Sequence, residues 1–156
     1  MDGHNFERLR AHILPLSVSQ EFDVARTEWV LAAIEISEEW DSCPCGQDIK
    51  EHCYIRNRLN GNATYVGNVC INRFIQIDTG SLFDGLKRIA ADNSANANHD
   101  LIEHAWRNGY LFSEKEYTFL KQTALKRKLS ASQLAWKQKI NRRILAKTIV
   151  QRRSTR

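Results

Sequence analysis

Residues 43–70 read CPCGQDIKEHCYIRNRLNGNATYVGNVC and hold all four cysteines of the chain. Cysteines clustered this closely indicate a metal site rather than disulfides in a reducing compartment. Asn60-Gly61 tolerates the positive φ of a tight hairpin, so residues 53–56 and 63–66 are predicted to be paired strands. A helix is predicted to begin near Cys70, and the hairpin returns the chain so that Cys70 meets the first three cysteines.

Four thiols that converge in this way fit a single zinc ion, because Zn²⁺ prefers four tetrahedral ligands and binds thiolates well. The predicted ligands are Cys43, Cys45, Cys53 and Cys70. His52 is the alternative to Cys53, since adjacent strand residues point to opposite faces and only one of them reaches the metal. An iron–sulfur cluster is the other thiolate-bound cofactor considered. A site closed by four protein ligands has no open position for water, which disfavours zinc hydrolysis and predicts a structural role for one zinc per chain.

The same stretch resembles a zinc-binding segment found in small proteins of phages, plasmids and bacterial mobile elements. The shared pattern is a C-x-C-G turn, an I-x-x-x-C strand entry, an Asn-rich hairpin and V-G-x-x-C at a helix start. The residues that carry it here are Cys43, Cys45, Gly46, Ile49, Cys53, Asn57, Gly61, Val66, Gly67 and Cys70. The order is similar to a treble clef, with one cysteine at the helix where a standard treble clef has two. Residues 108–144 also resemble the basic helical region that follows in such proteins.

Helical patterns dominate the rest of the chain. Ser19 is predicted to begin a helix that runs to about Ser37, with apolar residues spaced three and four apart. Asn98, Ser113 and Ser130 are predicted helix N-caps, the last two within capping boxes. The predicted fold is therefore α+β, mostly helical with a small zinc-bound, treble-clef-like β-hairpin module. The predicted parts of one compact domain are an N-terminal helical segment (1–39), the zinc-binding hairpin module (40–78) and a helical region with a basic C-terminal helix and tail (79–156).

Charge is divided unequally along the sequence. Residues 121–156 contain twelve Lys and Arg and no Asp or Glu, whereas residues 1–120 contain eleven basic and eighteen acidic residues. A basic excess this segregated is typical of proteins that bind phosphate backbones or acidic partners, although it also suits a solvated basic helix and tail. Trp136 lies among the cations, where it either stacks on an unpaired base or packs into a helical core. The predicted nucleic-acid contacts are Lys126, Arg127, Lys128, Trp136, Lys137, Lys139, Arg142, Arg143, Lys147, Arg152 and Arg153.

These features predict a non-catalytic, zinc-containing accessory protein that binds DNA or RNA, and the resemblance implies that it belongs to a mobile element. No window of about 18 apolar residues is present, and the N-terminal residues lack the apolar run of a signal peptide. We therefore expect no membrane partner and a cytoplasmic location, and the resemblance implies that the cell is a bacterium or a phage-infected host. No glycine-rich phosphate loop is present, and no small-molecule substrate is expected.

Two other functions fit parts of the sequence. A protein-binding adaptor or anti-defence inhibitor of a nucleoprotein complex would use an acidic cluster to imitate nucleic acid, although such a cluster also suits a solvated helix end. That cluster comprises Glu35, Glu38, Glu39 and Asp41. A metal-dependent nuclease is disfavoured, because no paired carboxylates stand near the cysteines and the histidines are poorly spaced for one helix face. Its candidate residues are His52, Asn57, His99 and His104.

Overall fold

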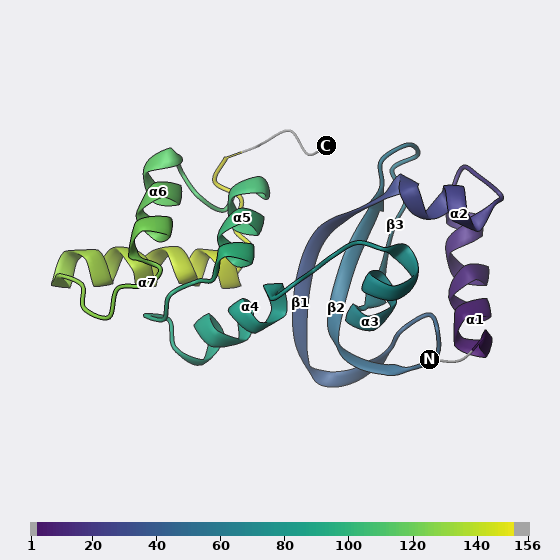
Figure 1. Cartoon of the computed structure of the whole chain (residues 1–156), viewed down its shortest axis with the longest axis horizontal. Coiled ribbons are helices and arrows are strands. Elements are labelled where there is room, and N and C mark those ends of the chain that lie inside the picture. The colour runs from purple at the N-terminus through teal and green to yellow at the C-terminus, as the bar shows by residue number, and fades with distance from the viewer. Residues whose placement is uncertain (1–2, 152–156) are drawn as a thin grey trace. The chain divides into compact units, whose positions relative to one another are not determined.

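The computed structural model describes residues 3–151 and divides the chain into two compact units, Met1–Thr79 and Gly80–Arg156 (Figure 1). The sequence predicts one compact domain, but each unit buries an apolar core of its own, with Ile55 and Val66 in the first and Leu101 and Ile140 in the second. Helices and a three-stranded sheet are both present, which confirms the α+β class. Within residues 3–151, no helix combines the length and apolar character needed to cross a membrane.

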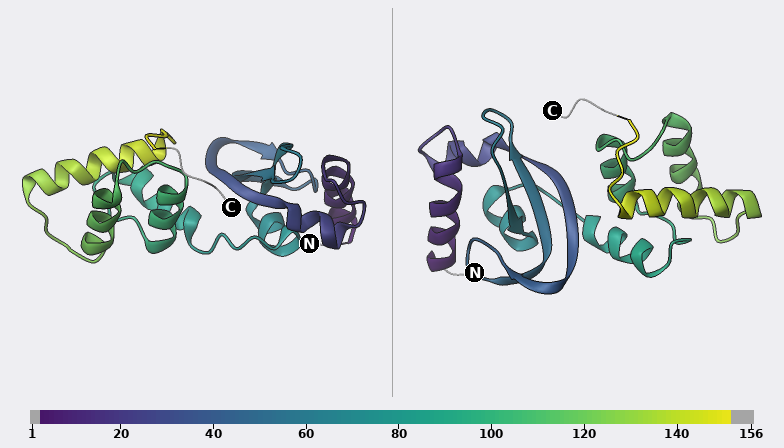
Figure 2. Two further views of the ribbon diagram at one scale, coloured as in Figure 1. Left: turned by 90° about the horizontal axis from the view of Figure 1, so that it is seen from above. Right: turned by 180° about the vertical axis from the view of Figure 1, so that it is seen from behind.

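The first unit is built around an antiparallel sheet with strand order β1-β2-β3. In the middle of the sheet, Cys53 lies opposite Ile34 on β1 and Val66 on β3, and all three side chains are buried. Helix α3 lies over one face of this sheet (Figures 1 and 2). The unit comprises α1 (Gly3–Ile13), α2 (Phe22–Ala25), β1 (Trp29–Ser42), β2 (Asp48–Asn57), β3 (Ala63–Gly67), α3 (Asn68–Cys70), two 3₁₀ turns (Leu14–Leu16, Arg26–Glu28) and a π turn (Ile71–Ile75).

The helix predicted over residues 19–37 is wrong, and with it the all-helical segment predicted for residues 1–39. Helix α2 ends at Ala25, and strand β1 begins at Trp29. The spacing of three and four residues is real, but β-branched Val30, Ile34 and Ile36 also suit a strand. Pairing with β2 extends from Trp29 to Ile36, with an irregularity between Leu31 and Ala33, and this tertiary contact outweighs the local preference for helix.

The buried carboxylate of Glu28 fixes the start of β1. Its Oε1 accepts hydrogen bonds from the backbone N–H of Val18 at 2.7 Å and from Nδ2 of Asn57 at 2.8 Å, and its Oε2 accepts one from the N–H of Ser19 at 2.9 Å. Burial alone would raise the pKa of Glu28, but these hydrogen bonds together with the charge of Arg58 lower it. The chain therefore turns from helix to strand at a carboxylate whose lone pairs are satisfied.

The described part of the second unit, residues 80–151, contains four helices, with α7 running crosswise to α5 and α6 (Figures 1 and 2). Asn98 caps α5 by accepting from the N–H of Leu101, and Ser130 and Gln133 form the predicted capping box of α7. At Ser113, by contrast, the side chain makes no cap hydrogen bond with α6. The helices are α4 (Leu82–Ala91), α5 (His99–Arg107), α6 (Glu114–Thr123) and α7 (Ala131–Leu145).

A buried ion pair joins α6 to α7 and explains why the box at Ser113 does not form. Glu116 turns inward, where Arg143 Nη1 approaches its Oε1 at 2.7 Å. The N–H of Phe112 and Trp136 Nε1 also donate to this carboxylate. Burial opposes ionisation of Glu116, but Arg143 and the two hydrogen bonds outweigh it and lower the pKa. The stability contributed by ionised Glu116 is therefore present at neutral pH and is lost as the pH falls through this lowered pKa.

Substitution of Arg143 tests this pair. Arg143→Ala is expected to destabilise the second unit by about 3–5 kcal/mol, because it leaves a buried carboxylate without its cation. Arg142→Ala is the matched control, since Arg142 is exposed and its loss is expected to change stability by less than about 0.5 kcal/mol. Urea unfolding followed by circular dichroism measures both changes. Equal effects of the two substitutions would contradict the assignment.

Candidate metal centre and basic surface

Two cysteines of the candidate metal centre lie in a tight turn between β1 and β2. The N–H of Gly46 donates to the carbonyl of Cys43 at 2.7 Å, and the N–H of Cys43 donates to the carbonyl of Gln47 at 2.8 Å. Gly46 has φ of +102°, a conformation that other residues rarely adopt. Hydrogen bonds and glycine together therefore hold Cys43 and Cys45 on one compact turn.

Cys70 joins these two from the end of α3. The three Sγ atoms all lie within 4.8 Å of one another, and the Cys43 and Cys70 sulfurs are 3.5 Å apart. All three side chains are buried, with exposures of 2%, 0% and 1% for Cys43, Cys45 and Cys70. The backbone N–H of Gly67 donates to Cys43 Sγ at 3.3 Å. This trio of thiols can hold a metal ion, as the hairpin argument predicts.

The thiols of the trio do not titrate alike. A hydrogen bond shared between the sulfurs lowers the pKa of Cys43 to about 5 and raises that of Cys70, and burial raises the pKa of Cys45. Three buried thiolates would repel one another strongly, so the metal-free trio favours a single thiolate sharing protons with its neighbours. A divalent cation would remove this constraint, because metal ligation requires deprotonated sulfur and compensates its charge.

Cys53 lies outside the trio, so of the four predicted ligands the structure brings three together. It is fully buried in β2, and burial raises the pKa of its thiol to about 12. His52 belongs to the other face of β2, where its Nε2 lies 3.1 Å from Asp41 Oδ2 and its ring lies near those of Tyr54 and Tyr65. His52 and Cys53 therefore point to opposite faces of β2, as predicted for adjacent strand residues.

Helix α1 covers the cysteine turn, a feature that sequence reasoning missed. A Cβ atom on Gly46 would lie 2.3 Å from Arg8 Nη1, so the guanidinium sits directly against the turn. One helical turn later, His12 Nε2 lies 2.7 Å from Thr64 Oγ1 on β3. Burial lowers the pKa of His12, while negative charge at Cys43 acts in the opposite direction. Arg8 and His12 lie more than 30 positions before Cys43, and no local sequence signal links them to it.

Metal binding by the trio can be tested with Co²⁺, which gives a thiolate-to-metal absorption band. The native chain is expected to bind Co²⁺ with this band, and Cys70→Ser is expected to weaken binding by at least about tenfold, because it removes a thiolate that the fold positions. Val69→Ala is the matched control, since Val69 precedes Cys70 and is 55% exposed. An unchanged band and affinity in Cys70→Ser would contradict the site.

Exposed cations of the second unit form the second candidate site. Lys126, Arg127 and Lys128 lie in the connection between α6 and α7, and Lys139 and Arg142 continue along the exposed side of α7. These five residues are hereafter the basic surface. Asn96 Nδ2 donates to the carbonyl of Lys126 at 3.1 Å, which anchors the connection to the body of the unit. Lys147 is half-buried beyond α7, and Arg152 and Arg153 lie outside the described residues.

Two of the predicted nucleic-acid contacts, Lys137 and Arg143, are buried in folding contacts instead, and a third, Trp136, is stacked on a neighbouring ring. Lys137 is fully buried, and its Nζ contacts Asn96 Oδ1 and lies 3.4 Å from the carbonyl of Thr123. Arg143 is buried in the ion pair with Glu116. Trp136 stacks on Phe119, with ring centroids 4.1 Å apart. Lys137 and Arg143 therefore do not present their charges to solvent, because buried polar partners hold them at inward-facing positions of α7.

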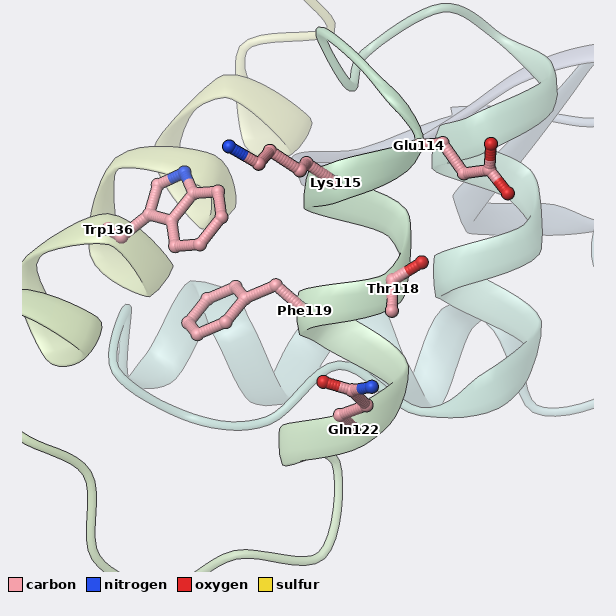
Figure 3. A pocket seen from close by; sticks show the side chains of 6 residues that line it. All are labelled: Glu114, Lys115, Thr118, Phe119, Gln122 and Trp136. Carbon is pink, nitrogen blue, oxygen red and sulfur yellow. The ribbon is translucent and has the colours of Figure 1, made fainter.

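An open groove lies between α6 and α7 (Figure 3), and its lining residue Trp136 is three positions before Lys139 of the basic surface. Its volume is about 480 Å³. Phe119 and Trp136 provide its aromatic surface, and short polar or charged side chains complete the lining. The lining residues are Glu114, Lys115, Thr118, Phe119, Gln122 and Trp136.

Two of the residues considered for a nuclease, Asn57 and His104, have structural partners. Asn57 is buried, donates to Glu28 and accepts from the backbone N–H groups of Leu59 and Asn60 in the hairpin turn. His104 is buried on α5, where its Nε2 lies 2.9 Å from Asn108 Nδ2 and burial lowers its pKa to about 4. These positions account for both side chains through folding contacts.

Comparison with protein-family models, with curated proteins and with solved structures finds no match for this chain. The function of the chain is therefore inferred from the geometry of the cysteine trio, the basic surface and the groove.

Proposed function

We propose that this chain is a non-catalytic nucleic-acid-binding accessory protein whose first unit is stabilised by zinc. The observation that carries the proposal is the basic surface: three consecutive exposed cations lead into α7, and two more follow on its exposed side. By sequence, the second unit has sixteen Lys and Arg against six Asp and Glu, a formal charge of +10. Such a field favours the phosphate backbone of DNA or RNA.

The shape of α7 supports the same conclusion. At its N-terminal end, the exposed positions Ala131, Ser132 and Ala135 carry small side chains, and Lys139 and Arg142 follow on that side of the helix. Small residues allow a helix to approach a bulky partner closely, and the cations beyond them meet phosphates. Contacts of this kind position a protein on nucleic acid without reading its sequence, so the expected binding has little base specificity.

Salt dependence tests the basic surface. If its five cations each neutralise one phosphate, the logarithm of the DNA association constant should fall with the logarithm of salt concentration with a slope of about −4 to −5. Replacing Lys126, Arg127 and Lys128 together by alanine should reduce the steepness by about 3. Fluorescence anisotropy with a labelled duplex and a labelled single strand measures both quantities.

Arg88→Ala together with Arg107→Ala is the matched control for this experiment. Both arginines are exposed in the second unit but lie on α4 and α5, away in sequence from the basic surface. The control is expected to keep most of the native slope. Binding that does not change with salt, or an equal loss in the control, would count against the proposed function.

Within this proposal, zinc is the metal of the trio and Cys53 is its fourth ligand. Zinc is favoured because buried thiolates in a closed setting suit a structural Zn²⁺ site. Cys53 lies on the buried side of β2, and negative charge at Cys43 acts on its thiol. Ligation requires the Cys53 side chain to turn toward the trio and lose its proton, which bound Zn²⁺ would favour.

Zinc content and the Co²⁺ spectrum test the fourth ligand. The purified chain is expected to contain one zinc, and Cys53→Ser should shift the visible Co²⁺ bands because one sulfur is replaced. His12→Gln is the matched comparison, since His12 is a nitrogen donor close to Cys43, and its spectrum should equal the native one. If the Co²⁺ bands shift in His12→Gln but not in Cys53→Ser, the assignment of Cys53 as the fourth ligand is contradicted.

A protein-binding adaptor is the second candidate function, and the position of the acidic cluster favours it. Glu38, Glu39 and Asp41 are exposed on edge strand β1, next to Trp40, which is 67% exposed. An exposed tryptophan among carboxylates suits a basic protein surface. Pull-down with and without nuclease treatment separates the two functions, because partners held by the adaptor survive nuclease and those bridged by nucleic acid do not.

A further inference from the structure

The groove between α6 and α7 combines an aromatic surface with a polar rim, and Trp136 in its lining lies one helical turn before Lys139 of the basic surface. We propose that it receives an unstacked base of single-stranded nucleic acid, which packs against Trp136 and Phe119. This inference rests on the proposed function and adds to it the strand state of the ligand. A volume of about 480 Å³ leaves room for a base together with part of its sugar.

The aromatic surface of the groove is held rigidly. The rings of Phe119 and Trp136 stack with an interplanar angle of 19°, and Trp136 Nε1 donates to Glu116 Oε2 at 2.9 Å. Glu116 is itself fixed by the ion pair with Arg143. The platform is thus organised before a ligand arrives, so little side-chain freedom is lost on binding. Stacking of bases on such aromatic surfaces is tolerant of sequence, in keeping with contacts made mainly to phosphates.

The rim offers hydrogen-bonding groups around this platform. Thr118, Gln122 and Lys115 are exposed on the same side of α6 as Phe119, and Figure 3 shows their side chains around the groove. Together they provide a hydroxyl, an amide and an ammonium group, which include both donors and acceptors. An amphipathic peptide would instead need a long apolar stripe, and this groove has only two aromatic side chains in its lining.

The neighbouring charges favour a nucleic acid over other flat ligands. Lys139 follows Trp136 by three positions on α7, one helical turn away, and Lys115 on α6 is itself part of the groove lining. Phosphates next to a base bound at Trp136 would therefore meet Lys115 and Lys139. A duplex keeps its bases stacked and paired, so only an unpaired strand can offer a base to the platform.

The test compares two single-stranded ligands of equal length and charge, an oligothymidylate and an abasic oligomer. The native chain is expected to bind the oligothymidylate at least about fivefold more tightly, because only this ligand has bases to stack. Thr118→Leu fills the groove without removing Trp136 from the fold, and it should lose this preference while still binding the abasic oligomer. Thr148→Leu, an exposed position outside the groove lining, is the control and should keep the preference.

Four outcomes would overturn the inference. The first is equal binding of the two oligomers by the native chain, and the second is an undiminished preference in Thr118→Leu when its thermal unfolding is native-like. The third concerns an oligoglutamate peptide used as a competitor. If this peptide displaces oligothymidylate from the native chain but not from Thr118→Leu, the groove belongs to an acidic protein partner. The fourth is failure of the native chain to bind either oligomer or a duplex at low salt; it is distinct from the others because it would also remove the proposed function.

Discussion

Convergence of three buried thiols is the constraint on which the first unit depends. Cys43 and Cys45 come from a turn, Cys70 comes from a helix, and the β2–β3 hairpin lies between them in the sequence. Three sulfurs within 4.8 Å of one another would be costly to ionise together without a cation. Small modules bury too little apolar surface to be very stable, and a metal bound by such sulfurs would add its binding energy to folding.

The second unit has no cysteine and is held together differently. Its core includes the Glu116–Arg143 pair, buried Lys137 and buried Asn141, which donates to the carbonyls of Asn93 and Ala95. Part of the positive charge visible in the sequence is therefore used inside the unit, where it is satisfied by oxygen acceptors. The five cations of the basic surface are exposed, and the aromatic platform of the groove is fixed by the same Glu116. Core and candidate interface are thus coupled through one carboxylate.

The sequence predicted those features whose cause is local. The hairpin follows from Asn60-Gly61, and the caps at Asn98 and Ser130 follow from side chains that reach backbone N–H groups three residues on. Features decided by distant contacts were not predictable in the same way. Strand β1 forms because β2 pairs with it, Glu116 leaves its expected box to meet Arg143, and Arg8 reaches the cysteine turn from a separate helix. The convergence of the cysteines was predicted only in part. The hairpin brings Cys43, Cys45 and Cys70 together, but Cys53 remains outside this trio in the sheet.

Zinc K-edge X-ray absorption of the native, fully folded chain tests the central claim most directly, because it reports which atoms surround the metal. The account predicts one zinc per chain with a first shell dominated by sulfur at about 2.3 Å. A folded protein without metal, or a zinc surrounded only by oxygen and nitrogen, would contradict it.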